Sequence, residues 1–204
     1  MNRISGALVL LVSLALSSCA PFEAWFDYSA LDTKIQFIGR MQPVEDEGPR
    51  YAYPGTVRFR CDCTGVDVAF QDEGTGGDKL TNFVNILVDG KEAATVQLNN
   101  QARQLSGVRG LKRGEHLIEV VKRTGPYAGA IRFLGVSLQG TLLEPPPLPE
   151  RRIEVIGDTV TCGYGNEAQI LAPNNTEPNT GYHSKNEDNS KAYGSVLEIG
   201  RAHV

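Results

Sequence analysis

The sequence predicts a mainly β protein, in which a β-sandwich of the jelly-roll type is followed by the first strand, loop and helix of an α/β domain. Three observations predict this order. Short alternating runs bounded by turn residues fill the middle of the chain, a spacing typical of sandwiches and jelly rolls. A proline-rich segment then breaks the pattern. After it comes an apolar run that ends in Gly157-Asp158-Thr159.

The strands of the sandwich are predicted from apolar or alternating runs, and turn residues separate them. These runs are Ile35–Ile38, Val57–Arg60, Val66–Phe70, Phe83–Val88, Ala93–Leu98, Leu117–Lys122 and Ala130–Leu138. Asp89-Gly90 lies between two of them and is the strongest short-range hairpin signal. We expect residues 31–143 to form this domain and residues 19–30 to be a linker before it.

The proline-rich segment at residues 144–150 is expected to be a second linker, because such segments are stiff and extended. Residues 151–197 then begin an α/β domain. Arg151 to Ile156 is a buried-strand pattern, and Lys191 to Leu197 begins a helical pattern. The sequence therefore predicts two domains joined by a stiff connection, the second of them represented only by its opening elements.

The composition excludes some classes of function. The 204 residues include 20 Lys and Arg against 24 Asp and Glu, which gives a formal net charge of −4. A nucleic-acid-binding protein needs a basic face for its phosphate contacts, so we expect no nucleic acid as a partner. With 41% hydrophobic and 22% charged residues, the composition is that of an ordinary globular protein.

The first 18 residues are predicted to be a lipoprotein signal peptide. Arg3 provides the positive charge, and Ala7 to Leu16 form an apolar run too short to span a bilayer. Leu16-Ser17-Ser18-Cys19 resembles a bacterial lipobox, in which cleavage before Cys19 leaves its sulfur diacylated. Ala20 is typical of sorting to the outer membrane. We expect a chain at the outer membrane or cell surface of a Gram-negative bacterium, touching the membrane only through the lipid at Cys19. The alternative is a plain secretory signal.

Three further cysteines remain in the exported chain: Cys61, Cys63 and Cys162. Cys61 and Cys63 lie two apart on a predicted strand, so their side chains point to the same face. A disulfide between them would need unusual geometry. A metal site would need further ligands, and none of the three histidines has a suitable spacing. We therefore expect two free thiols packed on one face of a strand, and the sequence implies no metal or organic cofactor.

The chemistry is predicted at Thr159. A strand that ends in Gly-Asp-hydroxyl places that hydroxyl at the carboxyl end of a parallel sheet, where ligands of open α/β sheets bind. A nucleophilic hydroxyl needs exposure, a base and nearby amides that hold the developing oxyanion. The backbone N–H of Thr159 is a candidate for one such amide.

The segment Ile153 to Asn166 resembles the first conserved block of the SGNH hydrolases, in the form found in carbohydrate esterase family two. Four weaker motifs follow the order of that family: Gly39-Arg40, Tyr53-Pro54-Gly55, Val88-Asp89-Gly90 and Gly114-Glu115-His116. The resemblance covers about residues 34–197. It implies a jelly-roll domain followed by an SGNH domain that removes O-acetyl groups from plant polysaccharides such as xylan or mannan, with a serine nucleophile and a histidine base.

The same resemblance assigns Thr159 to the position of the nucleophile, where the family has Ser, and assigns Asp158, Gly163 and Tyr164 to substrate binding. Two departures matter. The extra methyl group of Thr restricts χ1 and crowds attack. The family's later oxyanion donors and its C-terminal histidine have no counterpart here, and His183 is better interpreted as a solvated loop residue.

We therefore expect the full-length parent to be a carbohydrate O-acetyl esterase acting on an acetylated polysaccharide or oligosaccharide, and this chain to be an inactive fragment of it. Glu187 and Asn189 are weaker candidates for lining the cleft.

Two other functions remain open for residues 31–143. The first is a carbohydrate-binding module without catalysis at the cell surface, in which Tyr51, Tyr53 or Tyr127 would stack on sugars. The second is a domain that mainly buttresses the esterase domain and shapes its cleft.

Residues 198–204 are expected to be foreign to the protein. The hexapeptide Ile199 to Val204 is what ATC GGA AGA GCA CAC GTC encodes, and that string is a common short-read sequencing adapter. We expect the genuine sequence to continue differently after Leu197 or Glu198. Codons that differ from the adapter would contradict this.

Overall fold

The computed structural model describes residues 24–74, 76–77, 80–148, 150, 153–168 and 183–196. The strands, in chain order, are β1 (Phe26–Ser29), β2 (Gln36–Gly39), β3 (Gln42–Val44), β4 (Glu47–Tyr51), β5 (Gly55–Gly74), β6 (Phe83–Val88), β7 (Lys91–Gln97), β8 (Gln104–Arg109), β9 (Glu115–Lys122) and β10 (Gly129–Leu143). Three short 3-10 helices are η1 (Pro126–Ala128), η2 (Ser184–Asn186) and η3 (Asn189–Lys191). The predicted signal peptide, Cys19 and residues 198–204 lie outside the described residues.

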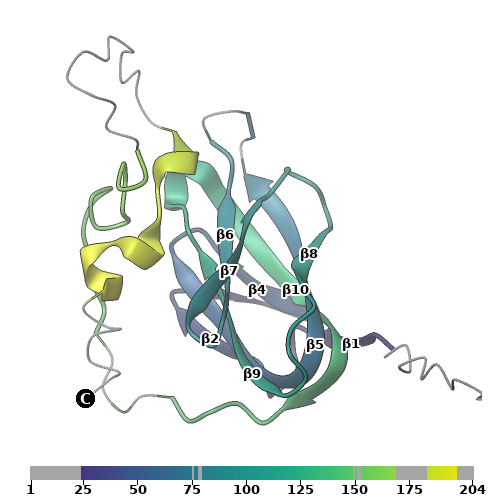
Figure 1. Ribbon diagram of the computed structural model, residues 1–204. Coiled ribbons are helices and arrows are strands. Elements are labelled where there is room, and N and C mark those ends of the chain that lie inside the picture. The colour runs from purple at the N-terminus through teal and green to yellow at the C-terminus, as the bar shows by residue number, and fades with distance from the viewer. Residues whose placement is uncertain are drawn as a thin grey trace, which may run out of the picture.

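The strands form an antiparallel sheet organised around the long strand β5. Along one edge β5 pairs first with β2 and then with β10. Along the other edge it pairs first with β9 and then with β8. The main path runs β3-β4-β10-β5-β9-β6-β7, and β1 is added beside β10. Because β5 changes partners along its 20 residues, the sheet folds over on itself into a jelly-roll-like sandwich (Figure 1). The predicted fold class is confirmed.

The core of the sandwich shows the two-residue period of its strands. Val57, Phe59 and Cys61 point inward from the first half of β5, whereas Val66 and Val68 point inward from the second half. The inward positions change from odd to even numbers because a β-bulge interrupts the pairing opposite Gln139 and Gly140. One extra residue on β5 thus lets both halves of a single strand bury their apolar side chains.

Two predicted strands, Val57–Arg60 and Val66–Phe70, are therefore parts of one strand. The segment between them carries polar and glycine residues that are typical of a turn, but the bulge keeps it within the sheet. The structure also contains β1 inside residues 19–30, which were expected to be a linker. Asp27 of β1 is in register with Ser137 of β10, so these residues are held in the sheet by backbone hydrogen bonds.

Cys61 and Cys63 were expected to be free thiols, and the structure corrects this: they form a disulfide. Both side chains are buried on the same face of β5. Their Cα atoms are 5.5 Å apart, within the range of about 4.4–6.8 Å that disulfides require. Successive same-face positions beside the bulge bring the two sulfurs together despite their close spacing in the sequence.

Residues 153–156 were expected to form a buried strand, and here too the structure differs. They form no strand, and Ile153, Val155 and Ile156 are 52%, 41% and 77% exposed. An apolar run becomes a buried strand only beside other strands that satisfy its backbone groups. No strand lies beside it in the part of the chain that the structure describes. The expected helix is present as a single turn at residues 193–196.

Residues 144–148 leave the end of β10 without regular secondary structure, and residues 153–157 lead into the turns around Thr159 (Figure 1). Gln36 donates a hydrogen bond to the carbonyl oxygen of Pro146 at 2.9 Å, and Arg40 forms an ion pair with Glu154. Among the described residues, no helix has the length and apolar character needed to cross a membrane.

Candidate functional site

Residues 157–168 form a compact run of turns around Thr159, which we call the Thr159 loop. The backbone N–H of Tyr164 donates to the carbonyl oxygen of Thr159 at 2.9 Å, and the N–H of Gly163 donates to that of Val160 at 3.0 Å. The carboxylate of Asp158 accepts a hydrogen bond from the N–H of Val160 at 3.0 Å. The loop is thus held closed by its own backbone, and Asp158 shapes the turn.

Thr159 lines a surface pocket of about 290 Å³. Tyr164 of the same loop lines this pocket too, while Leu80 and Tyr127 come from the β domain. Thr159 is half-buried, and neither its hydroxyl nor its backbone N–H makes a hydrogen bond with any residue that the structure describes. The pocket is therefore lined by a residue that carries a hydroxyl, beside two tyrosines and a leucine.

Of the residues assigned by resemblance, Thr159 and Tyr164 are brought together at this pocket. Asp158 is exposed and engaged in the turn. Gly163 is buried with φ +84°, and a Cβ added to it would overlap the carbonyl oxygen of Asp188. Only glycine combines this backbone conformation with so close an approach. Gly163 is therefore where the Thr159 loop packs on the segment around Asp188.

The segment at residues 183–191 is anchored to the β domain by Arg123, which follows β9. The Nε of Arg123 donates to the carbonyl oxygen of Glu187 at 2.7 Å, and a terminal nitrogen donates to that of Lys185 at 2.9 Å. The carbonyl oxygen of Arg123 accepts from the N–H of Asn189 at 2.9 Å. The planar guanidinium donates in several directions at once, so the side chain fixes two backbone groups of the segment and the backbone carbonyl of Arg123 fixes a third.

Lys122, which the sequence analysis did not select, lies close to this anchor together with Glu187 and Cys162. Lys122 is fully buried, and its Nζ donates to the carbonyl oxygens of Thr124 at 2.5 Å and Gly125 at 3.2 Å. Burial lowers the pKa of Lys122 to about 7, and the charge of Glu187 partly opposes this effect. Burial and the same carboxylate raise the pKa of the Cys162 thiol. The two-residue alternation of Ile118, Val120 and Lys122 was the available sign that Lys122 points inward.

The remaining candidates occupy other positions. His183 precedes η2 and is half-buried, with no hydrogen bond to Thr159. Glu187 is buried, and its side chain lies near Gly125 and not at the pocket. Tyr51, a candidate for stacking on sugars, is 2% exposed, and burial raises the pKa of its phenol. Tyr51 is therefore a core residue, because β4 turns it inward, whereas Tyr53 and Tyr127 are 55% and 66% exposed.

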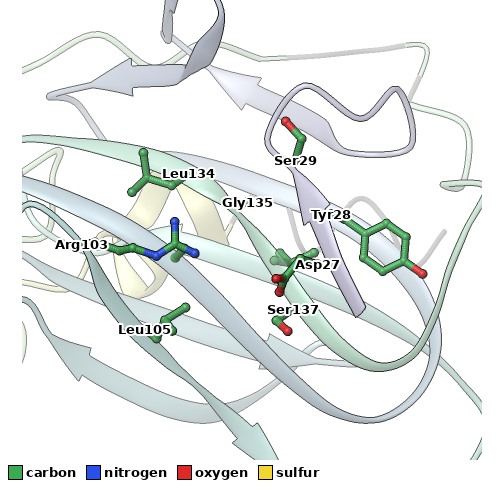
Figure 2. A pocket seen from close by; sticks show the side chains of 10 residues that line it. Asp27, Tyr28, Ser29, Arg103, Leu105, Leu134, Gly135 and Ser137 are labelled. Carbon is green, nitrogen blue, oxygen red and sulfur yellow. The ribbon is translucent and has the colours of Figure 1, made fainter. Parts of the chain in front are cut away.

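A second pocket, of about 270 Å³, lies on the outer face of the sheet across β1, β10, β5 and β8. Its floor contains the small residues Ala69 and Gly135, which are paired in register. Figure 2 shows Arg103 with two leucines on one side and Asp27 on the other. The side chains of Asp27 and Arg103 form no ion pair or hydrogen bond with any described residue. This groove has charged and apolar groups and is separate from the Thr159 pocket.

The described strands thus form a jelly-roll-like domain, and the Thr159 loop packs against its edge. Residues 37–147 match the family described as carbohydrate esterase 2 N-terminal, which is more than half of the chain. The chain therefore belongs to carbohydrate esterase family 2, and the resemblance seen in the sequence is confirmed.

Characterised relatives agree with this membership. The cellulase/esterase CelE of Acetivibrio thermocellus is 31% identical over 164 residues, which are 79% of this chain and 19% of that protein. An acetylxylan esterase / glucomannan deacetylase of Cellvibrio japonicus is 27% identical over 168 residues, which are 80% of this chain and 46% of that protein. The chain thus spans less than half the length of these relatives.

Solved structures give the same result. A family two carbohydrate esterase from Clostridium thermocellum in complex with cellohexaose matches with a TM-score of 0.71 and 29% identity, over 81% of this chain and 48% of the other. A family two carbohydrate esterase from Cellvibrio japonicus matches with a TM-score of 0.70 and 21% identity, over 87% and 50%. The second likeness shows the shared fold alone.

Proposed function

We propose that the full-length parent is an SGNH-type carbohydrate O-acetyl esterase that deacetylates a plant polysaccharide such as xylan or mannan. One observation carries the proposal: Thr159 lies on a tight loop with its hydroxyl and backbone N–H free of described partners, at a pocket completed by the β domain. The relatives named as acetylxylan esterase and glucomannan deacetylase support this substrate class.

In the proposed reaction, the Oγ1 of Thr159 attacks the acetyl carbonyl carbon and its proton passes to a base. The backbone N–H of Thr159 donates to the oxyanion of the tetrahedral intermediate. Collapse expels the sugar hydroxyl and leaves an acetyl ester on Thr159, which water then hydrolyses. The rings of Tyr127 and Tyr164 would hold the sugar beside the nucleophile. Since His116 and His183 do not contact Thr159, the proposal places the base outside the described residues and expects this chain alone to be inactive.

Acetate release by the full-length parent from acetylated xylan and glucomannan tests the role of Thr159. We expect Thr159→Ala to lower kcat by about a thousandfold or more. Thr159→Ser should raise kcat, because it removes the methyl group that restricts χ1. A Thr159→Ala enzyme with undiminished turnover would overturn the assignment.

A separate assay tests the expected inactivity of the 204-residue chain. Turnover of nitrophenyl acetate by this chain that disappears in its Thr159→Ala variant would refute the expectation.

The membrane anchor is a separate part of the proposal. We propose that Cys19 is diacylated and holds the protein at the outer membrane or cell surface. Metabolic labelling with a radioactive fatty acid should mark the native chain and leave Cys19→Ser unlabelled. Equal labelling of both, or of neither, would favour the plain secretory signal.

A second candidate function, a carbohydrate-binding module, is favoured by the groove in Figure 2. A free carboxylate and a free guanidinium on opposite sides suit an uncharged ligand with many hydroxyl groups, and the leucines offer apolar surface to its C–H faces. Titration of the chain with xylohexaose or mannohexaose tests this. Arg103→Ala and Asp27→Ala should each weaken binding, whereas Lys91→Ala at the β6–β7 turn is the charge control. Unchanged affinity in both groove variants would remove this candidate.

A further inference from the structure

The buried residue Asp188 contacts both the β domain and the Thr159 loop, through different parts of the same residue. Its side chain and backbone are completely inaccessible to solvent. A buried carboxylate is costly unless charged partners and hydrogen bonds compensate it. The partners of its carboxylate and of its backbone therefore need to be considered separately.

The carboxylate of Asp188 is held by the β domain together with its own segment. Asn85 of β6 donates from its Nδ2 to both carboxylate oxygens, each at 3.2 Å, and the Nε of Arg123 lies 3.9 Å from one of them. Asn85 is fully buried and is itself oriented by the hydroxyl of Thr95 on β7, at 2.9 Å. From the segment's own residues, the N–H and hydroxyl of Ser190 donate to the carboxylate at 3.0 and 2.6 Å, and the Nζ of Lys191 lies 3.4 Å from it.

The backbone of Asp188, by contrast, holds the Thr159 loop. Its carbonyl oxygen accepts from the Nδ2 of Asn166 at 2.8 Å, and its N–H donates to the Oδ1 of the same side chain at 3.0 Å. This reciprocal pair fixes the end of the loop. The middle of the loop meets the same carbonyl oxygen at Gly163, where a Cβ would overlap it. Asp188 thus links β6, which its side chain contacts, to the Thr159 loop, which its backbone contacts.

We propose that Asp188, fixed by Asn85 and Arg123 of the β domain, is a positioning residue that holds the Thr159 loop against Tyr127 and Leu80. The importance of this positioning for catalysis rests on the proposed esterase function. The link between Asp188 and the position of the Thr159 loop does not depend on that function. The β domain then determines the geometry of the reacting hydroxyl through one buried carboxylate.

Cys162 provides a reporter inside the loop, because its free thiol is half-buried. We would measure alkylation of Cys162 by iodoacetamide at one fixed pH, with the labelled peptide quantified by mass spectrometry. Asp188→Ala and Asn85→Ala should each accelerate labelling by about tenfold, as expected when buried hydrogen bonds to a charged group are lost. Asn99→Ala, at an exposed position of the β domain, is the matched control and should leave the rate unchanged.

Two further measurements separate positioning from general destabilisation. Hydrogen exchange should rise in residues 158–168 and stay unchanged in the paired strands β5 and β10. Asp188→Asn keeps one oxygen that can accept from Asn85 and Ser190, so it should accelerate labelling less than Asp188→Ala. A native labelling rate in Asn85→Ala, or acceleration spread evenly over the whole chain, would overturn the proposal. A parent without esterase activity would refute the proposed function and leave the coupling intact.

Discussion

Lys122 illustrates how one side chain can make stability depend on pH. Its ammonium group is buried beneath the last described segment and donates only to the oxygens of Thr124 and Gly125. Burial lowers its pKa from the ordinary 10.5 to about 7, while Glu187, Cys162 and Asp72 act in the opposite direction. Between these two values, the folded side chain is neutral and the unfolded one is protonated.

Because unfolding takes up a proton in that window, the contribution of Lys122 to the free energy of unfolding should rise with pH from about 7 to about 10. Below about pH 7 the buried charge has its full cost. We expect the free energy of unfolding of the native chain, minus that of Lys122→Met, to increase across this window with a slope of up to about 1.4 kcal/mol per pH unit. Urea unfolding of both chains measures it. A difference that does not vary with pH would contradict the expectation.

At the scale of the elements, the β6–β7 turn is held onto β9 by Asp89 and His116. One oxygen of the Asp89 carboxylate lies 2.7 Å from the Nδ1 of His116, and the other accepts from the N–H of Leu117 at 2.9 Å. The Nε2 of His116 lies 2.6 Å from the carbonyl oxygen of Lys112. The carboxylate of Asp89 raises the pKa of His116 above its usual 6.5. The protonated ring therefore joins the hairpin to its neighbouring strand.

A raised histidine pKa stabilises the fold fully below about pH 6.5, and this contribution is lost as pH rises through the folded pKa. His116→Gln should therefore lower the melting temperature more at about pH 5.5 than at about pH 8.5. The loss should remain below about 1 kcal/mol, because Asp89 is half exposed. Scanning calorimetry at both pH values checks this. An equal loss for His116→Gln at both pH values would contradict the role of the ion pair.

The same hairpin shows which elements a sequence can predict. Asp89 and Gly90 both have positive φ, 53° and 74°, so the turn follows from the local chemistry of two residues, and the prediction is confirmed. The single strand β5 could not be predicted in this way. Its bulge depends on pairing with Gly140, a residue far along the chain whose Cβ would overlap the backbone of Asp62. Long-range pairing decides such an element.

At the scale of the whole molecule, the candidate site likewise contains some residues that a local motif predicts and others that only long-range packing brings in. Thr159 and Tyr164 were found from one continuous motif, whereas Leu80 and Tyr127 complete the pocket from distant loops. Arg123 and Asp188 carry no motif, and their roles depend on the docking of residues 183–191 on the β domain. The expected strand at residues 153–156 failed for the same reason, since an apolar pattern does not specify the neighbours that a strand requires.

From these contacts we predict which part of the molecule can fold without the other. Among the described residues, all ten strands lie between residues 26 and 143, and the buried residues of the core cluster run from Ala30 to Leu142. A chain of residues 24–148 should therefore fold with the same β circular dichroism and one cooperative transition. Its melting temperature should fall by roughly 5–15 °C, because Asn85 and Arg123 lose their hydrogen bonds to the docked segment.

Residues 153–196 lack such a core among those described, since their buried side chains are the polar Ser184, Glu187 and Asp188 and the small Ala192, and the polar ones contact the β domain. We expect a peptide of residues 150–196 to show no cooperative transition alone and to gain protection from hydrogen exchange when mixed with the shorter chain. A 24–148 chain that fails to fold would mean that the docked segment is part of the sandwich itself. The expected result would mean that the β domain folds first and then provides the surface on which the Thr159 loop acquires its shape.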